Sequence, residues 1–187
     1  MKLGITVLRV VVGGFFIWHG LQKLKGWFGG HGLDATGQMF HGVGLRPGRV
    51  HATAAGLAET GGGALLLTGF MTPLGAAMIT GTMAVAIPKV HLKNGPWATN
   101  QGYEYNAVLM ASAFAIASAG PGPLSIDHLL GTERSGDGVA LAQLAAGIVG
   151  AAAAIEIGRR VPEDTPPQDS PDDSVREEGE VSQPATA

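Results

Sequence analysis

The stretch HATAAGLAETGGGALLLTGFMTP, residues 51–73, predicts a membrane-length helix that turns back into a second helix. It is mostly apolar, and Glu59 is its one acid. A helix needs roughly 17–25 residues to cross the hydrocarbon core of a bilayer. Gly69 is a suitable stop for the first helix, and Pro73 is a suitable first residue for the next. Because the link between them is so short, the two helices should form an antiparallel hairpin.

Apolar runs of similar length lie on both sides of this hairpin. Five spans are expected, at residues 4–24, 51–70, 73–91, 103–119 and 138–158. The segment 29–49 mixes apolar and polar residues, which favours a short helix at the membrane surface over the alternative, a disordered loop. Gly and Ala are abundant in the spans, and small residues let helix backbones approach closely in lipid.

The charged residues divide the chain into two unlike parts. Only 14% of all residues are charged, against about 25% in a typical soluble domain. Residues 1–160 carry 11 Lys and Arg against 7 Asp and Glu, whereas residues 161–187 carry one Arg against 8 acids. The second part is also rich in proline and poor in apolar residues, so we expect it to be a disordered, solubilising tail.

These patterns predict an all-α fold, a polytopic membrane helical bundle. The expected organisation is a four-helix core over residues 1–131, a fifth membrane helix over 132–160 and the acidic tail over 161–187. The chain has no cysteine, which excludes disulfides, thiol relays and Cys-ligated metals as chemistry of this chain. No metal site and no nucleic-acid partner are expected, and the lipid bilayer is the first partner.

Successive spans alternate in direction, so polar residues at alternate ends gather on one face. That face also holds most of the basic residues in the loops and at the span ends, which places it in the cytoplasm by the positive-inside rule and puts the N-terminus outside. The basic residues of this face are Lys23, Lys25, Arg46, Arg49, Lys89, Lys93, Arg159 and Arg160.

Two charged residues lie well inside the spans. Counting the rise of a helix puts Arg9 roughly 8 Å and Glu59 roughly 16 Å from the same face. A lone charge in a bilayer is unfavourable by at least about 2.5–3.5 kcal/mol, so each needs a partner or the bundle interior. We expect an extended Arg9 side chain to reach Glu59 in a salt bridge that fixes helix register, and the alternative is a role for Glu59 in proton handling.

Six residues are the candidate site. Glu59, His19 and Glu104 are the candidate catalytic, proton-handling residues. His19, Lys23, His91 and Tyr103 are the candidate cofactor-binding residues, which we expect to meet at one end of the bundle. Such a group suits a quinone headgroup, whose carbonyls accept hydrogen bonds and whose reduction takes up protons that His and Glu can supply. A b-type haem held by His19 and His91 is an alternative.

The residues that carry these features resemble the DoxX family of small bacterial membrane proteins. The matching stretches are LRVVVGGFFIWHGLQKL, AGLAETGGGALLLTGFMTPLGA, KVHLKNG, GYEYNAVL and GPGPLSID, within about residues 3–130. The resemblance implies a four-helix membrane bundle in the bacterial plasma membrane. It also implies an association with quinone-linked oxidoreductase assemblies and with thiol or oxidative stress. The segments beyond residue 130 are outside the resemblance.

Three functions compete at this point. The first is a membrane subunit of a redox complex that docks a quinone at the polar face, together with other protein subunits. The second is a non-enzymatic scaffold that recruits soluble redox enzymes. The third is a small transporter that uses Arg9 and Glu59. Because the chain lacks cysteine, any sulfur chemistry would have to come from a partner.

Overall fold

The computed structural model describes residues 3–162, and within that range every regular element is a helix. The predicted disorder of residues 161–187 falls almost wholly outside the described residues. The α-helices are α1 (Leu3–Lys25), α2 (Gly32–Gly42), α3 (Gly48–Thr68), α4 (Thr72–Ala86), α5 (Glu104–Ala119), α6 (Ile126–Leu130) and α7 (Asp137–Arg160). A π-helical turn, η1 (Ile87–His91), and two 3₁₀ turns, η2 (Leu92–Asn94) and η3 (Ala98–Asn100), connect α4 to α5. The predicted all-α class is confirmed.

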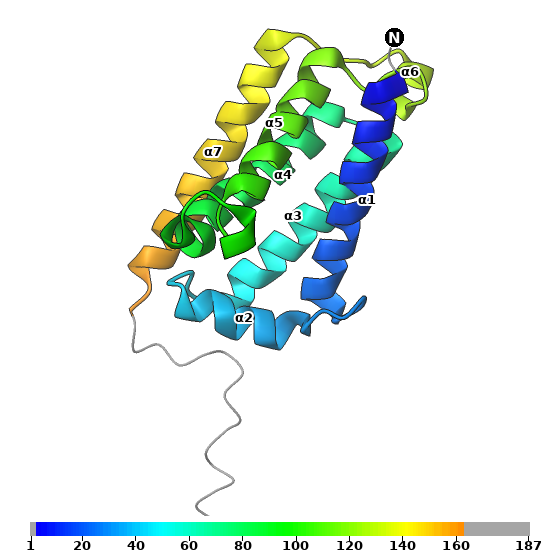
Figure 1. Ribbon diagram of the computed structural model, residues 1–187. Helices are drawn as coiled ribbons and strands as arrows, with labels where there is room; N and C mark the ends of the chain where they lie inside the picture. Colours follow the sequence, from blue (N-terminus) through cyan, green and yellow to red (C-terminus); the bar gives the residue numbers. More distant parts are fainter. Residues whose placement is uncertain (1–2, 163–187) are drawn as a thin grey trace, which may run out of the picture.

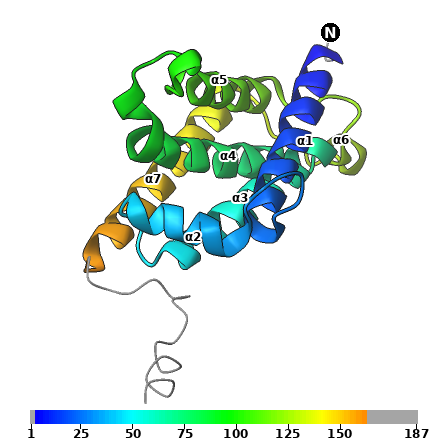
Figure 2. The ribbon, with the colours of Figure 1, turned by 60° about the horizontal axis from the view of Figure 1, so that its bottom comes forward.

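The five long helices run along one bundle, and the two short ones lie at its ends (Figure 1). Helix α2 crosses the end where α1, α4 and α7 finish and where α3 and α5 begin, and α6 lies at the opposite end (Figures 1 and 2). We call these the α2 end and the α6 end. Helix α4 is central, since it packs against α3, α5 and α7, while α1 packs mainly on α3.

Three helical segments of the described chain are long and apolar enough to cross a membrane: Leu3–Lys25, Thr72–Asn94 and Asp137–Arg160. The two other expected spans, α3 and α5, pack against them as part of the same bundle. Helix α5 has only 16 residues, and α3 is rich in glycine and carries Glu59. The segment 29–49 contains the expected helix, α2, so the disordered-loop alternative is wrong there.

Helices α1 and α3 touch through their backbones. A Cβ atom added at Gly13 would lie 2.6 Å from the carbonyl oxygen of Gly63, and one added at Gly63 would lie 2.6 Å from that of Gly13. Two turns further along α1, a Cβ added at Gly20 would lie 2.6 Å from the carbonyl oxygen of Gly56. The small residues of the two spans therefore bring the helices together, as the sequence predicts.

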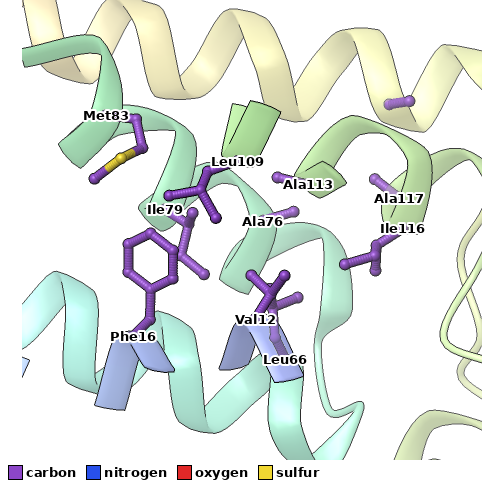
Figure 3. Packing of buried hydrophobic residues seen from close by; sticks show 11 residues of the cluster. Val12, Phe16, Leu66, Ala76, Ile79, Met83, Leu109, Ala113, Ile116 and Ala117 are labelled. Atoms are coloured by element: carbon purple, nitrogen blue, oxygen red, sulfur yellow. The ribbon is translucent and has the colours of Figure 1, made fainter. Parts of the chain in front are cut away.

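The apolar core forms where α4 meets its neighbours (Figure 3). Helix α1 contributes Val12 and Phe16, α3 contributes Leu66, and α4 contributes Ile79 and its neighbours on the same face. The remaining members of this cluster are Ala76 and Met83 of α4, Leu109, Ala113, Ile116 and Ala117 of α5, and Ala140 of α7. Short side chains on α5 and α7 keep these two helices close to α4.

The α3–α4 hairpin has the geometry that its sequence predicts. Gly69 adopts a left-handed conformation with φ 66°, its N–H bonds the carbonyl of Leu66 at 3.1 Å, and the N–H of Phe70 bonds that of Leu65 at 3.0 Å. These two bonds are the Schellman pattern that closes a helix C-terminus. Buried Asp127 accepts hydrogen bonds from the backbone N–H of Met71 and of Thr72, at 3.0 and 3.1 Å, and so caps the start of α4.

Arg9 does not contact Glu59, so that expectation is wrong. Its side chain, 1% exposed, donates to the carbonyl oxygens of Leu66 and Leu67 at 2.6 Å each. It also donates to the carbonyls of Pro121 at 3.1 Å and Leu124 at 2.6 Å. The end of α3 carries unpaired carbonyls and a partial negative charge, which attracts the guanidinium. Arg9 thus ties α1 to the hairpin and to the α5–α6 loop at the α6 end.

Candidate functional site

A cavity of about 640 Å³ lies among the long helices, and α2 contributes to its wall. Most of the wall is apolar and comes from α4 and its neighbours. Examples are Phe16 of α1, Phe40 of α2, Met78 and Met83 of α4, and Leu109 of α5. The polar side chains of the wall are His19, Lys23, His51, Glu59, Thr82, Lys89, His91, Tyr105 and Asn106. Four of the six candidate residues, His19, Lys23, Glu59 and His91, are in this list.

Lys23 and Glu59 form an ion pair across the α1–α3 contact. The Nζ atom of Lys23 lies 2.6 Å from Oε2 of Glu59. Glu59 is only 4% exposed, whereas the Lys23 side chain keeps 23% of its surface. A buried carboxylate is unfavourable without a partner, and the ammonium supplies one. The pair therefore gives the cavity wall a proton-carrying group and a hydrogen-bond donor side by side.

His19 lies one helical turn before Lys23 on α1 and also lines the cavity. Its Nδ1 atom is 3.0 Å from Oε1 of Gln22. The amide nitrogen of Gln22 in turn donates to the backbone carbonyl of Phe28 at 3.1 Å. Phe16, one turn earlier, makes an edge-on ring contact with His19 at 6.4 Å between centroids. The imidazole is thus held in orientation by the turn that follows α1.

The π-helical turn η1 brings His91 and Lys89 to the wall. Pro88 has no N–H group, so the regular α-helical ladder cannot continue through it, and the N–H of Leu92 bonds the carbonyl of Ile87 instead. His91 Nδ1 lies 2.8 Å from the carbonyl oxygen of Gln101, in the loop before α5. Lys89 Nζ lies 3.4 Å from the carbonyl oxygen of Gly44, in the loop after α2.

Tyr103 and Glu104 are not among the residues that line the cavity. The loop before α5 folds back on itself and engages both of them. The backbone N–H of Tyr103 bonds Gly95, and the carboxylate of Glu104 accepts from the N–H of Ala98 at 2.9 Å. The next residues, Tyr105 and Asn106, line the cavity instead.

Polar residues outside the six candidates also contribute to the wall, and two of them, His51 and Asn106, carry buried polar atoms. His51 lines the cavity, and its Nε2 atom is buried without a hydrogen-bond partner among the described residues. Asn106, 4% exposed, donates from Nδ2 to the sulfur of Met83 at 3.2 Å. His51 and Asn106 each lie in the first turn of a long helix at the α2 end. This position in the sequence could have identified them as candidates. Within residues 3–162 no group of three or more His, Asp or Glu is arranged to hold a metal ion.

Comparison with known proteins gives two matches and one negative result. The sequence model of a family described as DoxX matches residues 4–92. The protein named "Putative oxidoreductase CatD" of Bacillus subtilis (strain 168) is 30% identical to this chain over 126 residues. The aligned region covers 67% of this chain and 86% of that protein. No solved structure matches the chain.

Proposed function

Because this chain belongs to the DoxX family of membrane proteins, we propose that it is the membrane subunit of an oxidoreductase assembly. We place it in the bacterial plasma membrane, which its helices cross several times. Its role there is to hold a quinone headgroup in the cavity beside Lys23, Glu59 and His19. The name of the Bacillus subtilis relative supports the oxidoreductase part of this proposal.

The observation that carries the proposal is the composition of the cavity wall. Sites for small molecules are typically clefts of about 300–1,000 Å³, mostly apolar, with a few converging polar groups. A cavity of 640 Å³ with apolar walls and the Lys23–Glu59 pair fits that description. A quinone headgroup is a flat, largely apolar ring with two oxygens, and its tail is soluble in lipid. The residues present therefore suit it.

The residues of the wall would act by binding and by proton transfer. The Lys23 ammonium has three N–H donors, one of which is used by Glu59, so it can also donate to a ligand oxygen. Glu59 neutralises that ammonium and can take up a proton when the charge in the cavity changes. A quinone supplies a two-electron, two-proton acceptor when it is bound. Electrons carried by thiols or Cys-ligated clusters would have to come from a partner protein, since this chain has no cysteine.

The transporter alternative loses its geometric basis. It needs Arg9 and Glu59 on one pathway, but Arg9 is bound to backbone carbonyls at the α6 end and Glu59 to Lys23. The scaffold alternative is decided by the same experiment as the quinone proposal, because it requires no ligand in the cavity.

The experiment compares the wild-type chain with Glu59→Gln after gentle purification in detergent. Mass spectrometry of the extracted lipids should find quinone with the wild type and at least several-fold less with Glu59→Gln. Removing one partner of a buried ion pair leaves the other charge unpaired in the cavity wall. Glu133→Gln is the matched control, since Glu133 contacts His128 at the α6 end.

Two results would contradict the proposal. One is wild-type protein that carries no quinone and takes up none when it is added. The other is equal retention by wild type and Glu59→Gln. A soluble redox enzyme that co-elutes with quinone-free protein would favour the scaffold.

A further inference from the structure

The hydrogen-bond network behind His19 fixes which of its ring nitrogens carries the proton. The backbone carbonyl of Phe28 only accepts hydrogen bonds, so the Gln22 group that faces it is the NH₂ group. The amide oxygen of Gln22 therefore faces His19, and an oxygen of this kind also only accepts. Hence Nδ1 of His19 is the donor. A neutral imidazole has a single N–H, so Nε2 of His19 is a hydrogen-bond acceptor.

The ring of His91 has the same arrangement of donor and acceptor nitrogens as that of His19. Its Nδ1 atom lies 2.8 Å from the backbone carbonyl oxygen of Gln101, which only accepts, so Nδ1 is the donor here too. Nε2 of the neutral His91 ring is again an acceptor. Both imidazoles line the cavity. A third cavity residue, His51, has an Nε2 atom that is buried without a partner in the described part of the chain.

The donors of the same wall do not distinguish the two forms of a quinone, because a carbonyl oxygen and a hydroxyl oxygen both accept hydrogen bonds. Lys23 donates to Glu59 at 2.6 Å, Asn106 donates to the sulfur of Met83, and Thr82 donates to the carbonyl of Ile79 at 2.9 Å. The imidazoles differ, because they offer Nε2 acceptors for which no hydrogen bond is found within the described residues. A ligand that brings a hydroxyl group can donate to them, whereas a ligand that brings only carbonyl oxygens would set two acceptors against each other.

We infer that the cavity binds the reduced, hydroxyl-bearing form of its ligand, a quinol, more tightly than the oxidised quinone, through a hydroxyl donated to Nε2 of His19. This inference rests on the proposed function and adds which redox form of the ligand is bound more tightly. Gln22 is a positioning residue, since it acts on the ligand only by fixing the tautomer of His19. One turn further along α1, the Lys23 ammonium can donate to the oxygen of the same hydroxyl.

Preference for the reduced form has a thermodynamic consequence. One neutral hydrogen bond gained or lost changes an affinity by about fivefold to tenfold. Binding the reduced form tenfold more tightly raises the reduction potential of the bound two-electron couple by about 30 mV. The cavity would therefore favour reduction of its ligand in place and retention of the product.

The test measures two affinities of the full-length chain in lipid nanodiscs at pH 8 under argon. The probes are decylubiquinone and the quinol prepared from it by chemical reduction. Wild type should bind the quinol about tenfold more tightly than the quinone. His19→Leu removes the acceptor. The ratio of quinol affinity to quinone affinity should then be close to one, mainly because quinol binding is weaker. His128→Leu makes the same change at the α6 end and should keep the wild-type ratio.

Two variants of Gln22 separate positioning from packing. Gln22→Leu removes the acceptor for Nδ1 of His19 and should lower the ratio severalfold. Gln22→Glu restores an acceptor oxygen for Nδ1 but loses the donor to the Phe28 carbonyl, so it should recover only part of the ratio. All variants are first compared for folding by size-exclusion chromatography and thermal unfolding.

The outcomes distinguish the two proposals. Equal affinities for the two probes in wild type, or tighter binding of the quinone, would overturn this inference and leave the proposed function standing. An unchanged ratio in folded His19→Leu would overturn it as well. Failure of wild type to bind either probe would overturn the proposed function, and this inference with it.

Discussion

Arg9 should be the most important single side chain for the stability of this bundle. Its guanidinium makes four hydrogen bonds to backbone carbonyls of the hairpin end and the α5–α6 loop. Arg9→Met has a similar length but no donor. The carbonyl of Leu66 still accepts from the N–H of Gly69, so three carbonyls, those of Leu67, Pro121 and Leu124, lose the charged donor that binds them.

The magnitude follows from these three groups. A buried carbonyl left without a donor, such as that of Pro121, is unfavourable by about 1–3 kcal/mol, and the partly buried carbonyls of Leu67 and Leu124 lie at the lower end of that range. We therefore expect Arg9→Met to lower the free energy of unfolding by about 3–5 kcal/mol. For a chain of this size each kcal/mol shifts the midpoint of thermal unfolding by about 2–4 °C. The midpoint should fall by about 10 °C. Arg9→Lys keeps the charge but has fewer hydrogen-bond donors, so its midpoint should fall by about half as much.

The assay is thermal unfolding in one detergent, followed by the loss of monodisperse protein on size exclusion. Amide hydrogen exchange at the α3–α4 turn should rise in the same variants. Arg159→Met is the control, since the Arg159 side chain is 71% exposed. A midpoint for Arg9→Met within about 2 °C of wild type would refute the view that Arg9 ties this end of the bundle together.

Two further predictions concern helix packing and orientation. Gly63→Ala should lower the free energy of unfolding by about 2 kcal/mol, because its new methyl group meets backbone atoms of α1, whereas Gly150→Ala meets no atom within 4 Å and should be neutral. Equal stability of the two variants in detergent would contradict the close backbone contact. An alkaline phosphatase reporter should be inactive when fused after Arg160 and active when fused after Gly131, since the basic residues gather at the α2 end. The opposite pattern would contradict the proposed orientation.

Much of the fold is predictable from local rules. Gly69 and Pro73 mark the hairpin turn, and the structure ends α3 at Thr68 and begins α4 at Thr72. The hydrophobic runs locate the long helices. The π-helical turn η1 was not foreseen, although Pro88 is a visible reason for it. A proline in this position can end the helix, bend it or widen it into a π-helical turn. The outcome depends on which carbonyl accepts from the N–H of Leu92, and this is set by tertiary packing.

The candidate site was predictable where helix geometry sets depth. His19, Lys23 and His91 stand near the α2 end of the bundle, Glu59 lies deeper along α3, and all four line the cavity. Tyr103 failed to reach the wall because an irregular loop, which periodicity cannot describe, sets its position.

The Arg9–Glu59 contact failed for a different reason. The depth of Arg9 along its helix does not determine which acceptor its guanidinium binds. The backbone carbonyls at the end of α3 are such acceptors, and they cannot be recognised from the sequence. The catalytic and cofactor-binding roles assigned to the site residues stay predictions until the experiments above are made.

The glycine contact between α1 and α3 also has a mechanical consequence. Where glycines let two helices touch backbone to backbone, little side-chain rearrangement is available to separate them, so we expect α1 and α3 to move as one rigid plate. Lys23 is on α1 and Glu59 is on α3, so movements of the other helices should leave the distance between these two side chains unchanged. The opposing wall, with α2, the π-helical turn and the start of α5, must then supply whatever movement lets a ligand in or out. Spin labels across α1 and α3 should report one narrow distance, while labels between α1 and α5 should report a broader one.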